Sequence, residues 1–381
     1  MEVKQIATLV NNATKEINGE IAVMNEDLSN VVEVGESIEN AAGLDNYVRT
    51  LPNLIGRMVF VNRKYAGGAP SVLMDGWEYG SILAKYRGKM PEATENESWE
   101  LTDGAAYDMT IFTKPDVSAK FFNKRVTFEI PLSITEKQVK ESFHSPEELN
   151  AFFSMIYNAI DKSMTVKVDG LVSRTINNMI GETIINARTS PTVKAVNILQ
   201  QYNAKFGKSL KAASCIYDPE FIRYASLVIR LYSDRLTKLS KLFNIGGKDR
   251  FTSKDLQHIV LLSEFEAYAE TYLYSDTFHK EFTALPNAEK VAYWQGSGTN
   301  YDFTSTSKIH VTTASGEEVE QGGILGIIFD RDSLGVCNLD RRVTTNYNAK
   351  GEFFNNWYKF DAGYFNDLNE NFVVFYVADA S

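Results

Sequence analysis

The chain has 381 residues, of which 44% are hydrophobic and 23% charged, so it is long enough for two or three compact units of an ordinary soluble protein. Its 49 Asp and Glu outnumber its 39 Lys and Arg, and the resulting formal net charge of -10 argues against a general nucleic-acid binder, which needs a basic surface. The only two cysteines, Cys215 and Cys337, cannot build a disulfide framework and fit a reducing compartment.

The N-terminal residues 1–55 are acidic, with nine Asp or Glu against three Lys or Arg, or roughly -6 (3 − 9). Apolar residues from Ile6 to Ile17 recur at helical spacing and predict one short amphipathic helix. No basic start followed by an apolar run is present, and no stretch approaches about eighteen apolar residues, so we expect neither a signal peptide nor a membrane span.

Two segments after the glycine-rich joint at 66–70 have strand character. The first runs from about Gly80 to Met90, and the second from about Val117 to Leu132, where apolar and polar residues alternate. Because proline cannot donate to a sheet, Pro131 places the second strand at an edge. We expect a long hairpin with an acidic, irregular tip at 92–116. Its charges are either solvated or in contact with a neighbouring subunit.

The stretch from Ser145 to Arg188 predicts one long helix around which the chain is organised. Ser145 and Glu148 form the pattern of a capping box, Pro146 occupies the first helical position, and Ser190-Pro191 ends the helix. Apolar residues recur every three or four positions along it. The pair Asp169-Gly170 could kink this helix, and the residues alone leave that open.

The second half of the chain alternates between mixed elements and strands. We expect a short strand at 215–217, a helix from Asp218, mixed strand and helix at 256–274, and a strand at 308–313. Further strands are expected at 324–329, 336–339, 343–347, 353–360 and 372–377, with a turn at 348–351. The last strand is almost wholly apolar, so we expect it to be central in its sheet. This order lacks the βαβ alternation of a doubly wound fold and predicts an α+β protein.

No motif of catalysis or metal binding occurs in the sequence. The four histidines are scattered without metal-ligand spacing, and there is no nucleophile elbow. The stretch Gly246–Asp249 lacks the upstream glycine and the hydroxyl residue of a phosphate-binding loop. We therefore expect no enzyme activity, no cofactor and no metal.

Two stretches carry a resemblance to a known family. Residues 355–371, NNWYKFDAGYFNDLNEN, resemble the C-terminal region of major capsid proteins of tailed bacteriophages, and 121–134 followed by the helix at Ser145 resemble the same proteins. By organisation the resemblance covers most of the chain, and it is greatest to the coat proteins of small phages of Gram-positive bacteria. It implies the phage capsid fold, called the Hong Kong ninety-seven fold.

This resemblance implies a division of the chain into domains. An N-arm would occupy 1–65, an extended hairpin called the E-loop 70–134, and a peripheral domain 135–212 and 323–381, including the spine helix 146–188. An axial domain would occupy 213–322. The implied function is a structural protein that self-assembles into an icosahedral or prolate shell of pentamers and hexamers.

The implied partners are other copies of the chain, a separate scaffolding protein, a portal protein and packaged double-stranded DNA, with no membrane. The implied location is the virion capsid, assembled in the host cytoplasm. A scaffold separate from this chain is expected because the hairpin starts near residue 70. We expect no covalent crosslink between subunits. The predicted inter-subunit contacts all lie in the hairpin: Lys85, Arg87, Lys89, Glu95, Glu97, Trp99, Tyr107, Phe121 and Phe122.

Two alternatives stay open at this point. An encapsulin-like nanocompartment would share the fold and hold an enzyme as cargo, although the large hairpin tip argues against it. A soluble α+β enzyme with an unrecognised site would be a monomer or small oligomer with a defined pocket.

Overall fold

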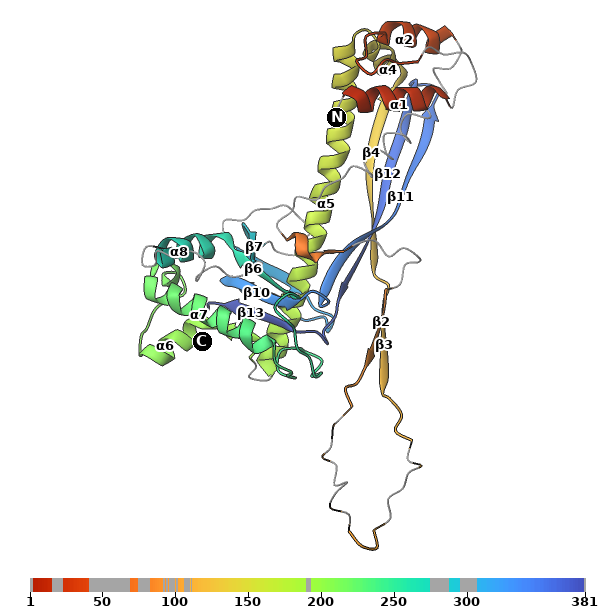
Figure 1. Ribbon diagram of the computed structural model, residues 1–381. Coiled ribbons are helices and arrows are strands. Elements are labelled where there is room, and N and C mark those ends of the chain that lie inside the picture. The colour runs from red at the N-terminus through yellow and green to blue at the C-terminus, as the bar shows by residue number, and fades with distance from the viewer. Residues whose placement is uncertain are drawn as a thin grey trace.

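The computed structural model describes residues 3–15, 23–40, 69–74, 83–91, 112–189, 193–274, 288–294 and 307–379, together with positions 93, 95, 100, 102–105 and 110. The described chain has an elongated shape, with a long helix along one side, a sheet-and-helix body, a helical cap at one end and a hairpin at the other (Figure 1).

Helix α5 (Pro146–Thr189) confirms the predicted spine and runs through Asp169-Gly170 without a break in the helix assignment. At about 1.5 Å per residue its 44 residues span roughly 66 Å. Ser145 Oγ accepts a hydrogen bond from the Glu148 amide at 3.2 Å, as an N-cap residue should. The helix ends at Thr189, directly before Ser190-Pro191.

The two halves of α5 bury their apolar residues in two different cores. The first half contributes Leu149, Phe153, Ile156, Ile160, Met164 and Val168 to the core of the cap. The second half contributes Leu171, Val172, Ile176, Met179, Ile180 and Ile184 to the core of the body. One apolar stripe at helical period therefore joins two cores that are separated along the helix axis.

The body is built on a five-stranded sheet with the order β5-β13-β10-β6-β7. Its strands are β5 (Ala195–Asn197), β6 (Gln257–Leu262), β7 (Ala288–Val291), β10 (Ile324–Asp330) and β13 (Phe372–Tyr376). Strand β13 has a neighbour on both sides, which confirms its predicted inner position. The helices of this part are α6 (Ile198–Phe206), α7 (Pro219–Leu236) and α8 (Ser263–Tyr274), and they lie beside the sheet (Figure 1).

A long sheet with the order β1-β11-β12-β4 connects the body to the cap. Its members are β1 (Leu73–Met74), β4 (Arg125–Thr135), β11 (Leu334–Asn348) and β12 (Phe353–Asn366). Strand β4 lies at its edge with Pro131 opposite Trp357, as the proline predicts. The two strands expected at 336–339 and 343–347 are one strand, because a register shift between Asn338 and Arg341 keeps the pairing with β12 continuous.

The cap packs three helices onto the start of α5 and the far end of the long sheet (Figure 1). These helices are α1 (Val3–Lys15), α2 (Val31–Asn40) and α4 (Glu136–Ser142). Helix α1 confirms the predicted amphipathic helix. Helix α2 was missed, although Val31, Val34 and Ile38 have helical spacing and are fully buried.

The hairpin consists of β2 (Leu83–Gly88) and β3 (Val117–Phe122), and among the described strands these two pair only with each other. The expected pairing of 80–90 with the whole of 117–132 is therefore wrong in its second half, since 125–135 belongs to the long sheet. The expected strand at 215–217 is also wrong. These residues form the 3₁₀ turn η2, because Asp218 Oδ1 accepts hydrogen bonds from the Glu220 and Phe221 amides and starts α7 there.

A second small ribbon packs on the spine. It consists of β8 (Lys308–Thr312) and β9 (Glu318–Gly322), while η1 (Pro70–Val72) precedes β1. Residues 54–61, a short apolar run in the sequence, lie outside the described residues. No helix in the described part of the chain combines the length and apolar composition that a membrane span requires. The division into N-arm, hairpin, peripheral and axial domains stays a prediction.

Candidate assembly site at the base of the hairpin

The hairpin has two chemically different faces, because side chains alternate across a strand. One face carries Leu83, Lys85 and Arg87 of β2 with Ser118, Lys120 and Phe122 of β3. The other carries Ala84, Tyr86 and Gly88 with Val117, Ala119 and Phe121. We call the first the basic face and the second the apolar face. The basic face contacts the body of the same chain.

Two connections of the body meet the basic face. The first is the turn from β10 to β11, and the second is the loop 367–371 between β12 and β13. Backbone hydrogen bonds hold them together: the Asp330 amide donates to Asn371 O at 3.0 Å, and the Asp367 amide donates to Ser333 O at 2.6 Å. The two connections therefore present their carboxylates from a fixed frame.

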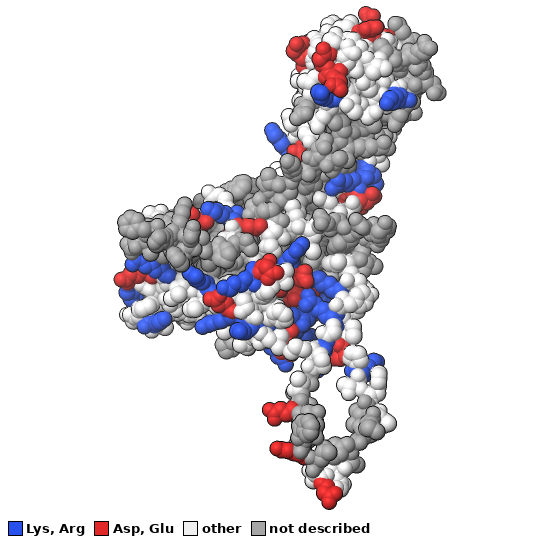
Figure 2. All heavy atoms as spheres, in the orientation of Figure 1, with Lys and Arg blue, Asp and Glu red and all other residues white. Residues whose placement is uncertain are grey.

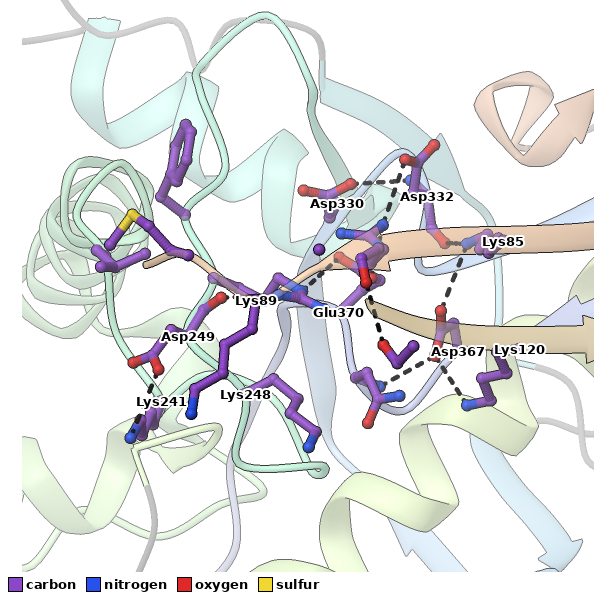
Figure 3. A pocket seen from close by; sticks show the side chains of 18 of the residues that line it. Lys85, Lys89, Lys120, Lys241, Lys248, Asp249, Asp330, Asp332, Asp367 and Glu370 are labelled. Carbon is purple, nitrogen blue, oxygen red and sulfur yellow. Dashed lines mark hydrogen bonds and ion pairs between the residues drawn. The ribbon is translucent and has the colours of Figure 1, made fainter. Parts of the chain in front are cut away.

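Three cations of the basic face pair with three carboxylates of this frame (Figure 3). Lys120 Nζ lies 2.8 Å from Asp367 Oδ1, and Lys85 Nζ lies 3.6 Å from Asp367 Oδ2. Arg87 Nη2 lies 2.7 Å from Glu370 Oε1 and 3.6 Å from Asp332 Oδ2. We call these six residues, Lys85, Arg87, Lys120, Asp332, Asp367 and Glu370, the hairpin clamp.

Aromatic side chains pack around the lysines of the clamp. The rings of Phe122 and Phe365 have centroids 5.0 Å apart, and Lys85 Nζ lies 4.6 Å from the centre of the Phe365 ring. Lys85 also donates a hydrogen bond to the backbone oxygen of Asp332. Cation–π contact and partial burial make Lys85 the most enclosed cation of the clamp, with a side chain only 13% exposed.

Burial and charge act in opposite directions on the two carboxylates. Burial of Asp367 acts to raise its pKa, but the hydrogen bond from Lys120 and the charges of Lys120 and Lys85 outweigh it, so its pKa is lowered. Burial of Lys85 lowers the pKa of its ammonium group, although Asp367 and the neighbouring carboxylates oppose that shift. The geometry of two lysines around one aspartate favours the ionised pair.

Glu370 behaves differently, since its side chain is only 2% exposed. Burial raises its pKa to about 7, and the opposing charges of Arg87 and Arg250 do not compensate. The contact of Arg250 Nε with Glu370 Oε2 is long, at 3.6 Å. Neither this Nε nor Glu370 Oε1 has a partner in hydrogen-bond geometry. Ionisation of Glu370 therefore weakens the folded state, whereas ionisation of Asp367 strengthens it.

A cavity of about 590 Å³ opens beside the clamp, between the hairpin base and the segment 239–256. Its lining includes Lys89, Met90, Lys248 and Phe251, together with clamp residues. Figure 2 shows Lys and Arg side chains gathered over the body where the hairpin joins it. In the part of the chain that the structure describes, no group of three or more His, Cys, Asp or Glu could hold a metal ion. The geometry is that of a structural junction.

Comparison with known proteins agrees with this geometry. Residues 6–376 match the family described as Phi29-like phage major capsid protein. The chain belongs to this capsid family. It is a structural protein of a phage shell, and copies of it assemble with one another. No individual curated protein matches this capsid protein.

The chain is similar to solved capsid structures. The capsid structure of Staphylococcus phage Andhra is 10% identical, with a TM-score of 0.54 over 83% of this chain and 86% of that chain. The capsid of cyanophage P-SCSP1u is 9% identical, with a TM-score of 0.43 over 81% and 87% of the two chains. The mature capsid of bacteriophage PhiM1 is 10% identical, with a TM-score of 0.43 over 84% and 88%. The Andhra structure carries the assignment of the fold, which confirms the predicted phage capsid architecture.

The capsid protein places its predicted contact residues in three different settings. Lys85, Arg87 and Phe122 face the chain's own body, while Lys89 lines the cavity. Glu95 and Phe121 are exposed. The remaining three, Glu97, Trp99 and Tyr107, lie outside the described residues. Whether any of the nine contacts a neighbouring subunit stays a prediction.

The acidic half of the clamp and the apolar face were not predicted from the sequence. The carboxylate of Asp332 lies next to Arg87 of the hairpin, which is far away in the sequence. No local sequence pattern indicates the ion pairs of Asp367 and Glu370, because their partners are far away in the sequence. The sequence does indicate that Tyr86 lies on the face opposite Lys85 and Arg87, since these residues alternate in a predicted strand.

Proposed function

We propose that each copy of this capsid protein extends its hairpin to a neighbouring copy, so that the contacts of the shell are completed between chains. The observation that supports this is the reach of the hairpin, which projects beyond the body from the clamp (Figure 1). The exposed acids Glu95, Glu100 and Asp103 near its tip form no ion pair with any described residue.

The sequence of the tip supports a contact with another molecule. Residues 91–113 contain six Asp or Glu and no Lys or Arg. The segment 235–254 of the body has the opposite charge, with six Lys or Arg against one Asp. Complementary charges of this kind steer association and fix its register. Lys89, Glu95, Glu97, Trp99, Tyr107 and Phe121 remain our candidates for the inter-subunit contact. We assign Lys85, Arg87 and Phe122 to holding the hairpin.

We further propose that the shell consists of pentamers and hexamers and encloses double-stranded DNA. A heterologous contact, in which one patch binds a different patch on the next copy, closes into such rings. The net charge of -10 suits a shell that holds its DNA loosely. A separate scaffolding protein and a portal protein would complete the assembly in the host cytoplasm.

We also propose a division of the chain into four domains. The N-arm would be 1–65, the hairpin region 70–134, the peripheral domain 135–212 with 323–381, and the axial domain 213–322. The five-stranded sheet draws β6 and β7 from the last of these and β5, β10 and β13 from the peripheral part. These two parts would therefore move together as one body during assembly, with the hairpin and the arm as the adjustable elements.

Replacement of residues 92–115 by a short Gly-Ser linker tests the role of the hairpin. The variant keeps all of β2 and β3, and we expect a folded subunit that forms no shells when it is expressed with the partner genes of the phage. Sedimentation velocity measures the shell fraction, and circular dichroism verifies the fold. Normal shells from the linker variant would contradict the proposed contact.

A further inference from the structure

The apolar face of the hairpin consists only of uncharged side chains and is open to water. It comprises Ala84, Tyr86, Gly88, Val117, Ala119 and Phe121, and all six are exposed. The largest of them, Tyr86, Phe121 and Val117, are 69%, 61% and 62% exposed. The rings of Tyr86 and Phe121 lie edge to face across the two strands, with centroids 6.2 Å apart.

The polarity of this ribbon is inverted relative to its surroundings. A sheet with one face on a protein core and one in water normally turns its apolar side chains inward and its charges outward. Here Lys85, Arg87 and Lys120 point to the body and pair with its carboxylates. Tyr86 and Phe121 lie on the opposite face and are exposed. An exposed apolar face on a two-stranded ribbon is an aggregation hazard, and the ribbon alone is only marginally stable.

The clamp determines which face points outward. Because side chains alternate with a period of two, a shift by one residue would exchange the two faces. The ion pairs of Lys85 and Lys120 with Asp367 hold the register in which Tyr86 and Phe121 face away from the body. The charged side is thus satisfied within the chain, and the apolar side is left without a partner among the described residues.

We propose that the apolar face of the hairpin is the surface that docks on a second copy of this chain. This inference rests on the proposed function, because it names the part of the hairpin that makes the contact. Tyr86 and Phe121 are the anchors of this contact. Aromatic side chains bury a large apolar area in protein interfaces and lose little conformational entropy when they do so.

The chemistry of the face selects a second copy over other occupants. Packaged DNA would require Lys or Arg on the contacting side, and this face has none. The capsid family supplies many identical copies at high local concentration, and each exposes apolar side chains on its body, among them Leu239, Leu242 and Phe251. A burial of two aromatic rings against such side chains would give a contact that is apolar at its centre and flanked by charge.

Photo-crosslinking identifies the occupant directly. We would place p-benzoylphenylalanine at Tyr86 and, as the control on the basic face, at Ser118. Shells assembled from a mixture of unlabelled and ¹⁵N-labelled subunits are irradiated, and mass spectrometry of the peptides distinguishes crosslinks between chains from crosslinks within one. We expect isotope-mixed dimers from position 86 and none, or far fewer, from position 118. Crosslinks only within one chain, only to a scaffolding protein, or equal from both positions would overturn the proposal.

Substitutions separate this inference from the proposed function. The variants Tyr86→Ser and Phe121→Ser should fold like the wild type, since both side chains are exposed, but the subunit concentration required for assembly should rise at least about tenfold. Ser118→Ala is the matched control and should assemble normally. If the linker variant fails to assemble while Tyr86→Ser and Phe121→Ser assemble like the wild type, the inference is wrong and the proposed function stands. If the linker variant assembles normally, the proposed function itself fails.

Discussion

A methyl group added to Gly181 would lie 2.5 Å from Cγ2 of Val311, so the spine helix and strand β8 meet where only a glycine fits. Val311 is 4% exposed and belongs to the body core. Its β-branched side chain has few alternative rotamers with which to make room. The close approach of α5 to the β8–β9 ribbon therefore depends on this one residue.

Gly181→Ala should destabilise the body. Alanine favours a helix by about 1 kcal/mol over glycine, but overpacking of a core costs about 1–3 kcal/mol, and a contact of 2.5 Å lies at the costly end. We expect a lower thermal midpoint, measured by scanning calorimetry on unassembled subunits. Gly322→Ala is the control, because the nearest atom to its added methyl group is 3.7 Å away. An unchanged or raised midpoint for Gly181→Ala would show that β8 moves freely.

Ile160→Ala tests the packing of the spine against the cap. Ile160 is fully buried in the cap core, and its truncation should cost about 2–5 kcal/mol. Met155→Ala on the same helix is the control, since Met155 is 60% exposed and the change should lie within about 0.5 kcal/mol. Urea unfolding followed by circular dichroism measures both. Equal costs would mean that the first half of α5 does not pack as described.

Asp367→Asn should loosen the hairpin without unfolding the body. The substitution removes the charge that Lys120 and Lys85 share and leaves the largely enclosed Lys85 without its nearest carboxylate. Hydrogen exchange of the β2 and β3 amides should accelerate by at least about tenfold, which corresponds to about 1.4 kcal/mol. Asp340→Asn is the matched control, because Asp340 pairs with Arg342 on the surface and is 70% exposed. Protection that stays unchanged in β2 and β3 would refute the role of the clamp.

Stability should fall as the pH rises, through Glu370. The pKa of Glu370 in the folded chain is about 7, above its ordinary value of 4.5, so the folded state holds a proton that the unfolded state has lost between these pH values. The contribution is complete below about pH 4.5 and is lost as the pH rises through 7. Its size is on the order of 3 kcal/mol.

Glu370→Gln is the variant that reveals this dependence. It should be more stable relative to the wild type at pH 8 than at pH 5, in urea titrations of unassembled subunits. Glu318→Gln on strand β9, whose side chain is 74% exposed, is the control. A wild-type pH dependence that Glu370→Gln leaves unchanged would place the titrating group elsewhere.

The elements set by local pattern could be predicted from the sequence. The spine helix follows from its apolar spacing and from Ser145 and Pro191, and the edge position of β4 follows from Pro131. The helix α2 could also have been found, since Val31, Val34 and Ile38 have the required spacing. The 3₁₀ turn at 215–217 could not have been predicted, because a short apolar run is equally typical of a strand.

The clamp could not be predicted, because its two halves are far apart in the chain. Lys120 and Asp367 are separated by 247 positions, and no local pattern connects a lysine with one of 49 acids over such a distance. The alternation of Lys85, Tyr86 and Arg87 in a predicted strand indicates two unlike faces, although these were not predicted. Which face meets the body depends on the position of Asp367 and Glu370, which only the tertiary structure provides.

Cryo-electron microscopy of assembled wild-type shells would show what covers the apolar face of the hairpin. We expect a neighbouring copy to cover Tyr86 and Phe121 in every capsomer, while Lys85, Arg87 and Lys120 keep their pairs with Asp367 and Glu370 of their own chain. A shell in which Tyr86 and Phe121 face solvent, or in which the three cations pair with carboxylates of a neighbouring copy, would contradict this expectation.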